Sequence, residues 1–198
     1  MRISSALCVL KFVICFIPLV SNADVSTEQY VILSTVLKHG LEENCAEIVI
    51  EEKTTAGTIA ISTPEKSIDA VAELLGIEVS LLRKWENENR DYDYLSENFA
   101  LPCQYHLISA EQRDKLFSTA ADNEPERGWR NFARKYPDAA GIIRMAKPTV
   151  DLEHNQALAY VEFDCGPSCG SGRFVTLSQT AGNSWQVTGG SLVWMAAE

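Results

Sequence analysis

The residue types with the clearest chemical potential gather in one glycine-rich stretch, Cys165–Gly172, whose sequence is CGPSCGSG. Ser168 and Ser171 lie within it, Asp164 precedes it, and His154 lies one predicted hairpin away. A serine becomes a nucleophile when a histidine accepts its proton and backbone N–H groups hold the oxyanion. Glycines can supply such N–H groups, so this stretch has the residue types of a hydrolase site.

The residues around this stretch argue against catalysis. The nucleophile of many serine hydrolases sits on a turn between a strand and a helix, whereas residues 174–177 are typical of a strand. His106 alternates with apolar neighbours, which favours a hydrogen-bonded strand position, and paired acids such as Glu51-Glu52 are expected on a solvated face. We therefore assign no catalytic residue. The candidate binding loop consists of Gly166, Ser168, Gly170, Ser171 and Gly172.

The N-terminus has the pattern of a secretory signal. Positive charge at Arg2 and Lys11 accompanies an apolar run, and small residues at positions 21 and 23 suit a signal peptidase. We predict that residues 1–23 are removed and that the product is exported to the periplasm or the medium. A retained anchor is the alternative, but Lys11 interrupts the apolar run and Pro18 ends it, short of the ~20 residues that a membrane span needs.

The cysteines predict disulfide bonds. Two of the six cysteines fall in the leader, and the remaining even number in an exported chain favours disulfides. Among the possible pairings we favour Cys165 with Cys169 and Cys45 with Cys103. A zinc site is the alternative, but zinc ligands usually come as two close pairs, and only one is present. A redox pair is also disfavoured, because redox cysteines are usually two residues apart. We expect no metal and no cofactor.

An acidic composition narrows the class of partner. The chain has 27 acidic and 17 basic residues and a net charge of −10, which becomes −12 when Arg2 and Lys11 leave with the leader. Nucleic-acid affinity comes largely from Lys and Arg that displace counterions. We therefore expect neither nucleic acid nor an anionic membrane as partner, but a protein or a small ligand. A basic toxin or enzyme would suit an inhibitor or immunity-type protein.

One motif, taken alone, would suggest DNA binding. Residues 72–85 have the small residue, the turn glycine and the apolar spacing of a bacterial helix-turn-helix. Such a motif needs a basic second helix, whereas here Arg83 and Lys84 are offset by three glutamates. Two packed helices around Gly76 explain the pattern without DNA.

Periodicity and turn signals predict an α+β protein. Residues 24–118 are expected to form helices with short strands, 119–126 a linker, and 127–198 a helix followed by a four-strand antiparallel meander, possibly one compact domain with 24–118. Predicted helices cover 27–38, 64–75, 80–89, 109–117 and 129–136. Predicted strands cover 45–51, 57–61, 104–108, 141–145, 157–163, 174–177, 185–188 and 192–194.

A set of motifs in residues 129–194, about a third of the chain, goes beyond these general signals. They are Trp129 with Phe132, Tyr136-Pro137, Gly141-Ile142-Ile143, QALAYV at 156–161, CGxxCGxG at 165–172, and Trp185 and Val187 with Trp194. In these residues the chain resembles a group of uncharacterised bacterial exported proteins. The resemblance implies an exported globular protein with a C-terminal sheet and transfers no catalytic residue.

The sequence thus predicts an exported, soluble, non-catalytic protein that binds a partner through its sheet and the stretch Cys165–Gly172. Two alternatives stay open. One is a secreted hydrolase with its site near that stretch, and the other is an inhibitor or immunity-type protein that binds a basic partner.

Overall fold

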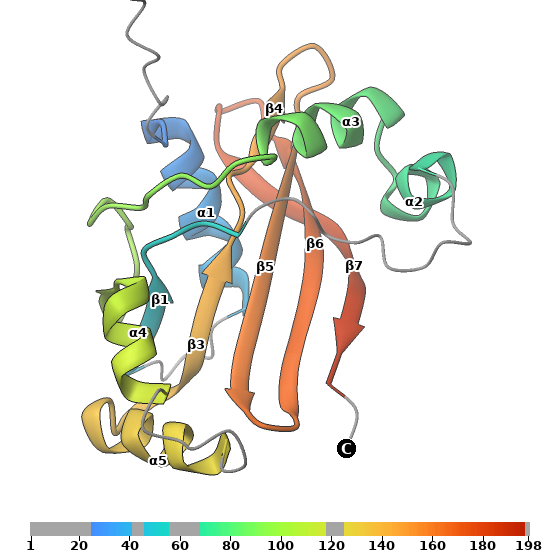
Figure 1. Ribbon diagram of the computed structural model, residues 1–198. Coiled ribbons are helices and arrows are strands. Elements are labelled where there is room, and N and C mark those ends of the chain that lie inside the picture. Colours follow the sequence, from blue (N-terminus) through green and yellow to red (C-terminus); the bar gives the residue numbers. More distant parts are fainter. Residues whose placement is uncertain (1–24, 41–45, 56–67, 118–124, 197–198) are drawn as a thin grey trace, which may run out of the picture.

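In a computed structural model, seven strands of the described residues form one mixed sheet, which is the framework of the fold (Figure 1). The structure describes residues 25–40, 46–55, 68–117 and 125–196. The strands are β1 (Glu47–Glu51), β2 (Gln104–Ile108), β3 (Ala139–Met145), β4 (Thr149–Asp151), β5 (Gln156–Gly166), β6 (Cys169–Gln179) and β7 (Trp185–Met195). The helices are α1 (Thr27–Gly40), α2 (Ile68–Leu75), α3 (Val79–Glu88), α4 (Ala110–Phe117) and α5 (Pro125–Lys135).

The strand order is β2-β1-β3-β5-β6-β7, with β4 paired to β5. The mixture of helices and strands agrees with the predicted α+β class, but the predicted four-strand meander is not matched as such. The antiparallel strands β3, β5, β6 and β7 continue into β1 and β2, which pair in parallel, and β4 is a separate short strand. Parallel neighbours need long crossover connections, so local sequence patterns cannot show that these strands meet.

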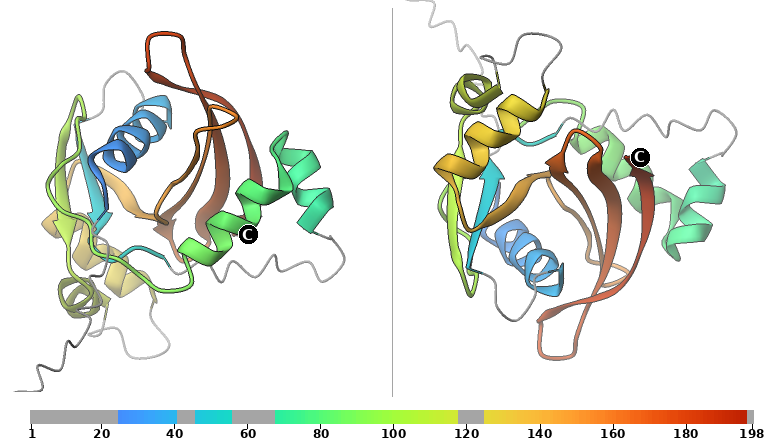
Figure 2. Two further views of the ribbon diagram at one scale, coloured as in Figure 1. Left: turned by 90° about the horizontal axis from the view of Figure 1, so that it is seen from above. Right: turned by 90° about the horizontal axis from the view of Figure 1, so that it is seen from below.

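Helix α1 fills one face of the sheet. Figure 2 shows the sheet curling around this helix. A capping box begins it, because the Ser26 backbone N–H donates to Gln29 Oε1 at 2.8 Å and the Gln29 N–H donates to Ser26 Oγ at 3.3 Å. The apolar side of α1, including Ile32 and Leu33, is buried against alternate residues of the strands. This face therefore carries the largest hydrophobic core.

The opposite face carries two separate apolar clusters. Helices α2 and α3 cover β5 and β6, where Trp85 packs edge-on against Tyr160 and Phe174. Helices α4 and α5 cover β1 and β3 around Val49 and Ile142. Figure 1 shows the two helix pairs at opposite corners of the sheet. A stretch of this face lies between them.

The α2–α3 pair explains the helix-turn-helix pattern. Gly76 ends α2 with a positive φ of 65°, a conformation that favours glycine. The apolar side of α3, with Leu81, Leu82 and Trp85, is buried toward the sheet. The pattern therefore encodes the packing of two helices on a sheet.

Several predicted elements differ in extent from the observed ones. The predicted strands 185–188 and 192–194 are one strand, β7, and the predicted strands 157–163 and 174–177 extend into the longer β5 and β6. The strand predicted over 57–61 lies outside the described residues, as does most of the predicted linker 119–126, whose last residues belong to α5. Strands β1 and β2 from the N-terminal region share the sheet with β3–β7.

None of the helices in the described part of the chain has the length and apolar character that crossing a membrane requires.

Candidate functional site

The stretch Cys165–Gly172 is the end of the β5–β6 hairpin. Cys165 and Cys169 form the predicted disulfide bond, with their Cα atoms 5.0 Å apart. Only Pro167 and Ser168 form the turn, because residues 169–172 already belong to β6. The predicted loop is thus mostly strand. The predicted pairing of Cys45 with Cys103 involves residue 45, which lies outside the described residues; Cys103 is disulfide-bonded.

Two glycines of this hairpin leave room for larger neighbours. A Cβ atom at Gly172 would overlap the Trp194 indole and the Tyr160 hydroxyl. A Cβ atom at Gly170 would lie 3.1 Å from Asp164 Oδ1 and 3.3 Å from the Trp194 ring. Because neither residue has a side chain, the Trp194 ring can lie against this part of β6, close to the Asp164 carboxylate.

Hydrogen bonds connect Trp194 to two side chains of β5. Trp194 Nε1 donates to the Tyr160 hydroxyl at 2.9 Å, and that hydroxyl donates to Glu162 Oε1 at 2.9 Å. Burial raises the pKa of Tyr160, and the charge of Glu162 raises it further. The phenol therefore stays protonated and keeps donating to the carboxylate.

An arginine lies between two carboxylates on the same face. Glu162 and Asp164 are two residues apart on β5, so both side chains point to the face opposite α1. Arg144 on β3 contacts both of them, with Nη2 3.0 Å from Glu162 Oε2 and 2.7 Å from Asp164 Oδ2. The Arg144 Nε atom is buried without a hydrogen-bond partner in the described part of the chain.

Glu51 adds a third carboxylate, on β1. Its side chain is only 10% exposed, and its Oε2 atom has no hydrogen-bond partner among the described residues. The nearest cation contact is Arg113, whose Nε lies 3.6 Å from that oxygen. Burial raises the pKa of Glu51; Arg113 and Arg144 lower it, and the charge of Asp164 adds to the rise. Glu51 was expected on a solvated face, and this expectation is wrong.

We call Glu51, Arg144, Tyr160, Glu162, Asp164 and Trp194 the carboxylate platform. It occupies the stretch between the two helix pairs and ends beside the Cys165–Cys169 turn. Its three carboxylates outnumber the two arginines that contact them, Arg144 and Arg113, so this surface keeps an excess of hydrogen-bond acceptors and of negative charge. Such a surface is suited to receive a group that carries positive charge and N–H donors.

The structure does not bring His154 to Ser168. His154 precedes β5 whereas Asp164 and the turn lie at its other end, which separates them by roughly 26 Å along the strand. His154 Nδ1 instead pairs with Asp151 Oδ2 at 2.7 Å in the turn before β5. A strand's direction decides this separation, and sequence spacing alone does not show it.

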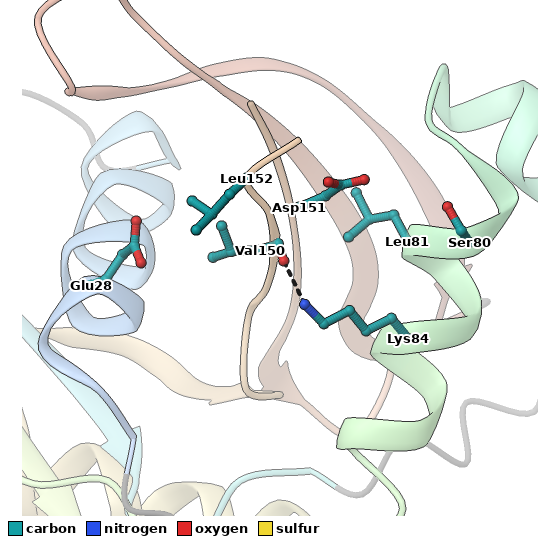
Figure 3. A pocket seen from close by; sticks show the side chains of 7 residues that line it. All are labelled: Glu28, Ser80, Leu81, Lys84, Val150, Asp151 and Leu152. Atoms are coloured by element: carbon teal, nitrogen blue, oxygen red, sulfur yellow. Dashed lines mark hydrogen bonds between the residues drawn. The ribbon is translucent and has the colours of Figure 1, made fainter. Parts of the chain in front are cut away.

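Asp151 also lines a cleft of about 450 Å³ between α1 and α3 (Figure 3). Glu28 on α1 and Ser80 and Lys84 on α3 face it, and Lys84 Nζ donates to the Val150 carbonyl at 2.8 Å. Ser80 is not hydrogen-bonded to His154. The cleft therefore holds a serine and an aspartate without the contact that would activate the serine.

His106 is hydrogen-bonded between strands. Its Nε2 atom lies 2.7 Å from Glu47 Oε1 on β1, and its ring packs near Tyr136.

Within the described ranges, no group of three or more His, Cys, Asp or Glu residues is arranged to hold a metal ion.

The platform was not predicted as a site from the sequence, in which Asp164 was considered only as a neighbour of Ser168 and Glu51 only as a solvated acid. A signal was present in β5, where Glu162 and Asp164 continue the alternate positions of Leu158 and Tyr160 in an otherwise apolar strand. Polar residues on one side of a central strand indicate that something other than an apolar core meets that side.

Comparisons with protein-family models, with curated proteins and with solved structures give no match to this chain. We therefore infer the function from the chemistry of the platform.

Proposed function

We propose that the protein is an exported, non-catalytic binding protein whose carboxylate platform receives a cationic group of a basic partner protein. Buried Glu51, with an oxygen that lacks a hydrogen bond, is the observation that carries this proposal. Such an acceptor costs about 1–3 kcal/mol when it is left without a donor. Arg113 Nε, 3.6 Å from that oxygen, forms an ion pair with it but lies too far away for a hydrogen bond. An arriving guanidinium or ammonium group would supply the missing donor.

Arg144 shows how the platform can hold a guanidinium. A single nitrogen of Arg144 contacts carboxylates from two positions of β5. The Trp194 ring and the Asp164 carboxylate both lie beside Gly170. An aromatic ring beside a carboxylate favours a cation by charge and by cation–π attraction.

The exposure of the platform favours a protein side chain as ligand. Its charged side chains are between 10% and 28% exposed, so they form a partly exposed surface rather than a deep cavity. The net charge of −10 also attracts a basic protein over distance and speeds its association. These features favour an inhibitor or immunity-type role over binding of a small molecule.

Peptide titration tests the proposal. The probe is acetyl-Gly-Arg-Gly-amide, followed through the NMR signal of the Trp194 indole N–H. We expect weak binding with a Kd on the order of 1 mM. The same peptide with citrulline in place of arginine has the shape but not the charge and is expected not to bind.

Variants locate the site. Asp164→Asn and Glu162→Gln are expected to weaken arginine-peptide binding about tenfold or more, since each loses a charged acceptor. Glu52→Gln is the matched control, because residue 52 follows the end of β1 and takes part in none of the ion pairs of the platform. Equal shifts with the citrulline peptide, or equal affinity in all three variants, would contradict the proposal.

N-terminal sequencing of the product made in cells tests export, and residue 24 should come first.

One observation favours a second candidate, a secreted hydrolase that uses two carboxylates. Burial raises the pKa of Glu51, whereas Asp164 is ion-paired to Arg144. Two carboxyl groups in such different environments can divide acid and base roles. Their strands flank β3, about 10 Å apart.

Hydrolase screening separates the two candidates. Nitrophenyl glycosides and esters are the probes. Under the second candidate Glu51→Gln lowers turnover at least 100-fold while Glu52→Gln leaves it unchanged. Absence of turnover above the solvent rate removes this candidate and leaves the binding proposal intact.

A further inference from the structure

Strand β7 forms an open edge of the sheet. It spans Trp185–Met195, and among the described residues no strand pairs with its outer side. Its sequence, WQVTGGSLVWM, contains no charged residue and no proline. Edge strands usually carry charges or proline to prevent pairing with other chains. Two register shifts interrupt its pairing with β6, and residues 189–192 between them pair regularly. This edge is therefore left open to an added strand.

A groove runs beside this edge on the α1 side of the sheet. It has a volume of about 450 Å³ and is bounded by Val36 and His39 of α1 and by residues 173–175 of β6 and 187–192 of β7. Figure 2 shows α1 inside the curve of the sheet, with β7 at the end of that curve. Gly189 and Gly190 leave the middle of β7 without side chains, and Leu192 is 56% exposed. A backbone can thus approach β7 while its side chains enter the groove.

The charge of the groove is opposite to that of the protein. Arg173 and His39 border it, and none of its lining residues is acidic, although the whole chain has a net charge of −10. A Cβ atom at Gly40 would lie 2.9 Å from Arg173 Nη2, which places that guanidinium at the end of α1, beside His39. The groove therefore favours an acidic group.

We propose that β7 and this groove bind an extended, acidic peptide segment of a partner protein. The segment adds to β7 as a further strand, so that main-chain hydrogen bonds supply affinity and alternate side chains fill the groove. A carboxylate of the segment meets Arg173 and His39. A second copy of the chain fits less well, because β7 has no acidic residue to offer and each copy carries a charge of −10.

This surface does not depend on the carboxylate platform. Arg173 and Val175 point to the α1 side of β6, whereas Gly172 and Phe174 point to the platform side. The two surfaces therefore bind partners of opposite charge, and loss of one leaves the other.

Peptide selection tests the proposal. A phage-displayed library of random twelve-residue peptides is selected on the purified protein, and synthetic copies of the selected peptides are measured by fluorescence anisotropy. We expect peptides rich in β-branched residues with at least one Asp or Glu and a Kd on the order of 10 µM. Hydrogen exchange should show that the amides of residues 186–192 become protected on binding.

Two variants and two controls locate the site. Arg173→Glu reverses the charge of the groove, and Leu192→Lys places a charge on the edge; each is expected to weaken binding at least tenfold. Arg83→Glu makes the same charge change on exposed α3, and Leu152→Lys changes a comparably exposed leucine at the other cleft; both should leave affinity unchanged. If Arg173→Glu does not fold, Arg173→Gln and Leu192→Lys carry the test.

Three results would overturn the proposal. They are a selection without binders, binders that lack acidic residues, and binders whose affinity the Arg173 and Leu192 variants leave unchanged. A concentration-dependent dimer in light scattering that Leu192→Lys abolishes would assign the edge to a second copy and overturn it as well.

Discussion

Alternate residues of β5 face two different environments. One set packs under α1 in the large core, and the other set starts under α2 and α3 and ends in the carboxylate platform. The first set consists of Ala157, Ala159, Val161 and Phe163, and the second of Leu158, Tyr160, Glu162 and Asp164. The same strand therefore carries a face that holds the fold together and a face on which polar groups are collected.

The difference comes from how each face is covered. Helix α1, of 14 residues, lies along one face, and its apolar residues form one continuous core with the strands. On the other face two short helix pairs cover opposite corners, and the polar side chains lie between them. One face of the sheet is thus covered by a continuous apolar core, whereas part of the other face is left to polar side chains.

The largest expected effect is the loss of packing under α1. Leu33→Ala removes a fully buried side chain. We expect a loss of about 3 kcal/mol in the free energy of unfolding, since the deletion leaves a cavity in a close-packed core. Denaturant unfolding measures this. Val31→Ala, at an exposed position of the same helix, is the control. A loss below about 1 kcal/mol would contradict the conclusion that the α1 face carries the largest hydrophobic core.

Gly172 tests the packing of the platform face. Gly172→Ala would drive a Cβ atom into Trp194 and Tyr160. We expect a destabilisation of about 1–3 kcal/mol by overpacking, together with a changed tryptophan fluorescence. Gly182→Ala is the control, because the nearest atom to a Cβ there is 3.9 Å away. Equal stability of both variants would show that Trp194 moves aside freely.

Glu51 tests the electrostatic character of the platform. Its raised pKa means that the folded state binds the proton more tightly than the unfolded state. Stability from this group is therefore present at acid pH and is lost as pH rises from the ordinary pKa of 4.5 through the raised pKa. Glu51→Gln is expected to stabilise the protein at neutral pH by about 1 kcal/mol and to remove this part of the pH dependence.

Urea unfolding across pH 3–8 measures the Glu51 effect. Glu52→Gln serves as control. A destabilised Glu51→Gln variant at neutral pH would indicate that the ion pair with Arg113 outweighs burial.

The smallest effect concerns the far end of β5. A hydrogen bond to Asp151 raises the pKa of His154 above its ordinary value, and the charge of Asp151 adds to this. Stability from a raised histidine pKa is present below the unfolded pKa and is lost as pH rises through the folded one. Because this side chain is 46% exposed and water screens the interaction, we expect only a small change, visible by NMR titration.

Asp151→Asn should return the pKa of His154 to its ordinary range. Asp164→Asn should leave it unchanged, because β5 separates the two sites. A shift of the His154 titration in Asp164→Asn would contradict the separation of His154 from Asp164 and Ser168 described above.

Local features were predictable from the sequence. The capping boxes at Ser26 and Ser109, the turn at Gly76 and the Cys165–Cys169 bond all depend on residues close together in the chain. Such features act through short hydrogen bonds, backbone conformation or covalent reach, so spacing is enough to show them.

Only the tertiary structure decided the candidate site. Glu51, Arg144 and Asp164 come together because β1 pairs in parallel with β3 and β3 pairs antiparallel with β5. No local pattern encodes which distant strands become neighbours, since that depends on crossovers and on packing between segments far apart in sequence. For the same reason His154 and Ser168, near in sequence, lie at opposite ends of a strand. The sequence alone determined the elements, the acidic charge and the sulfur bridge, and strand pairing determined which side chains can act together.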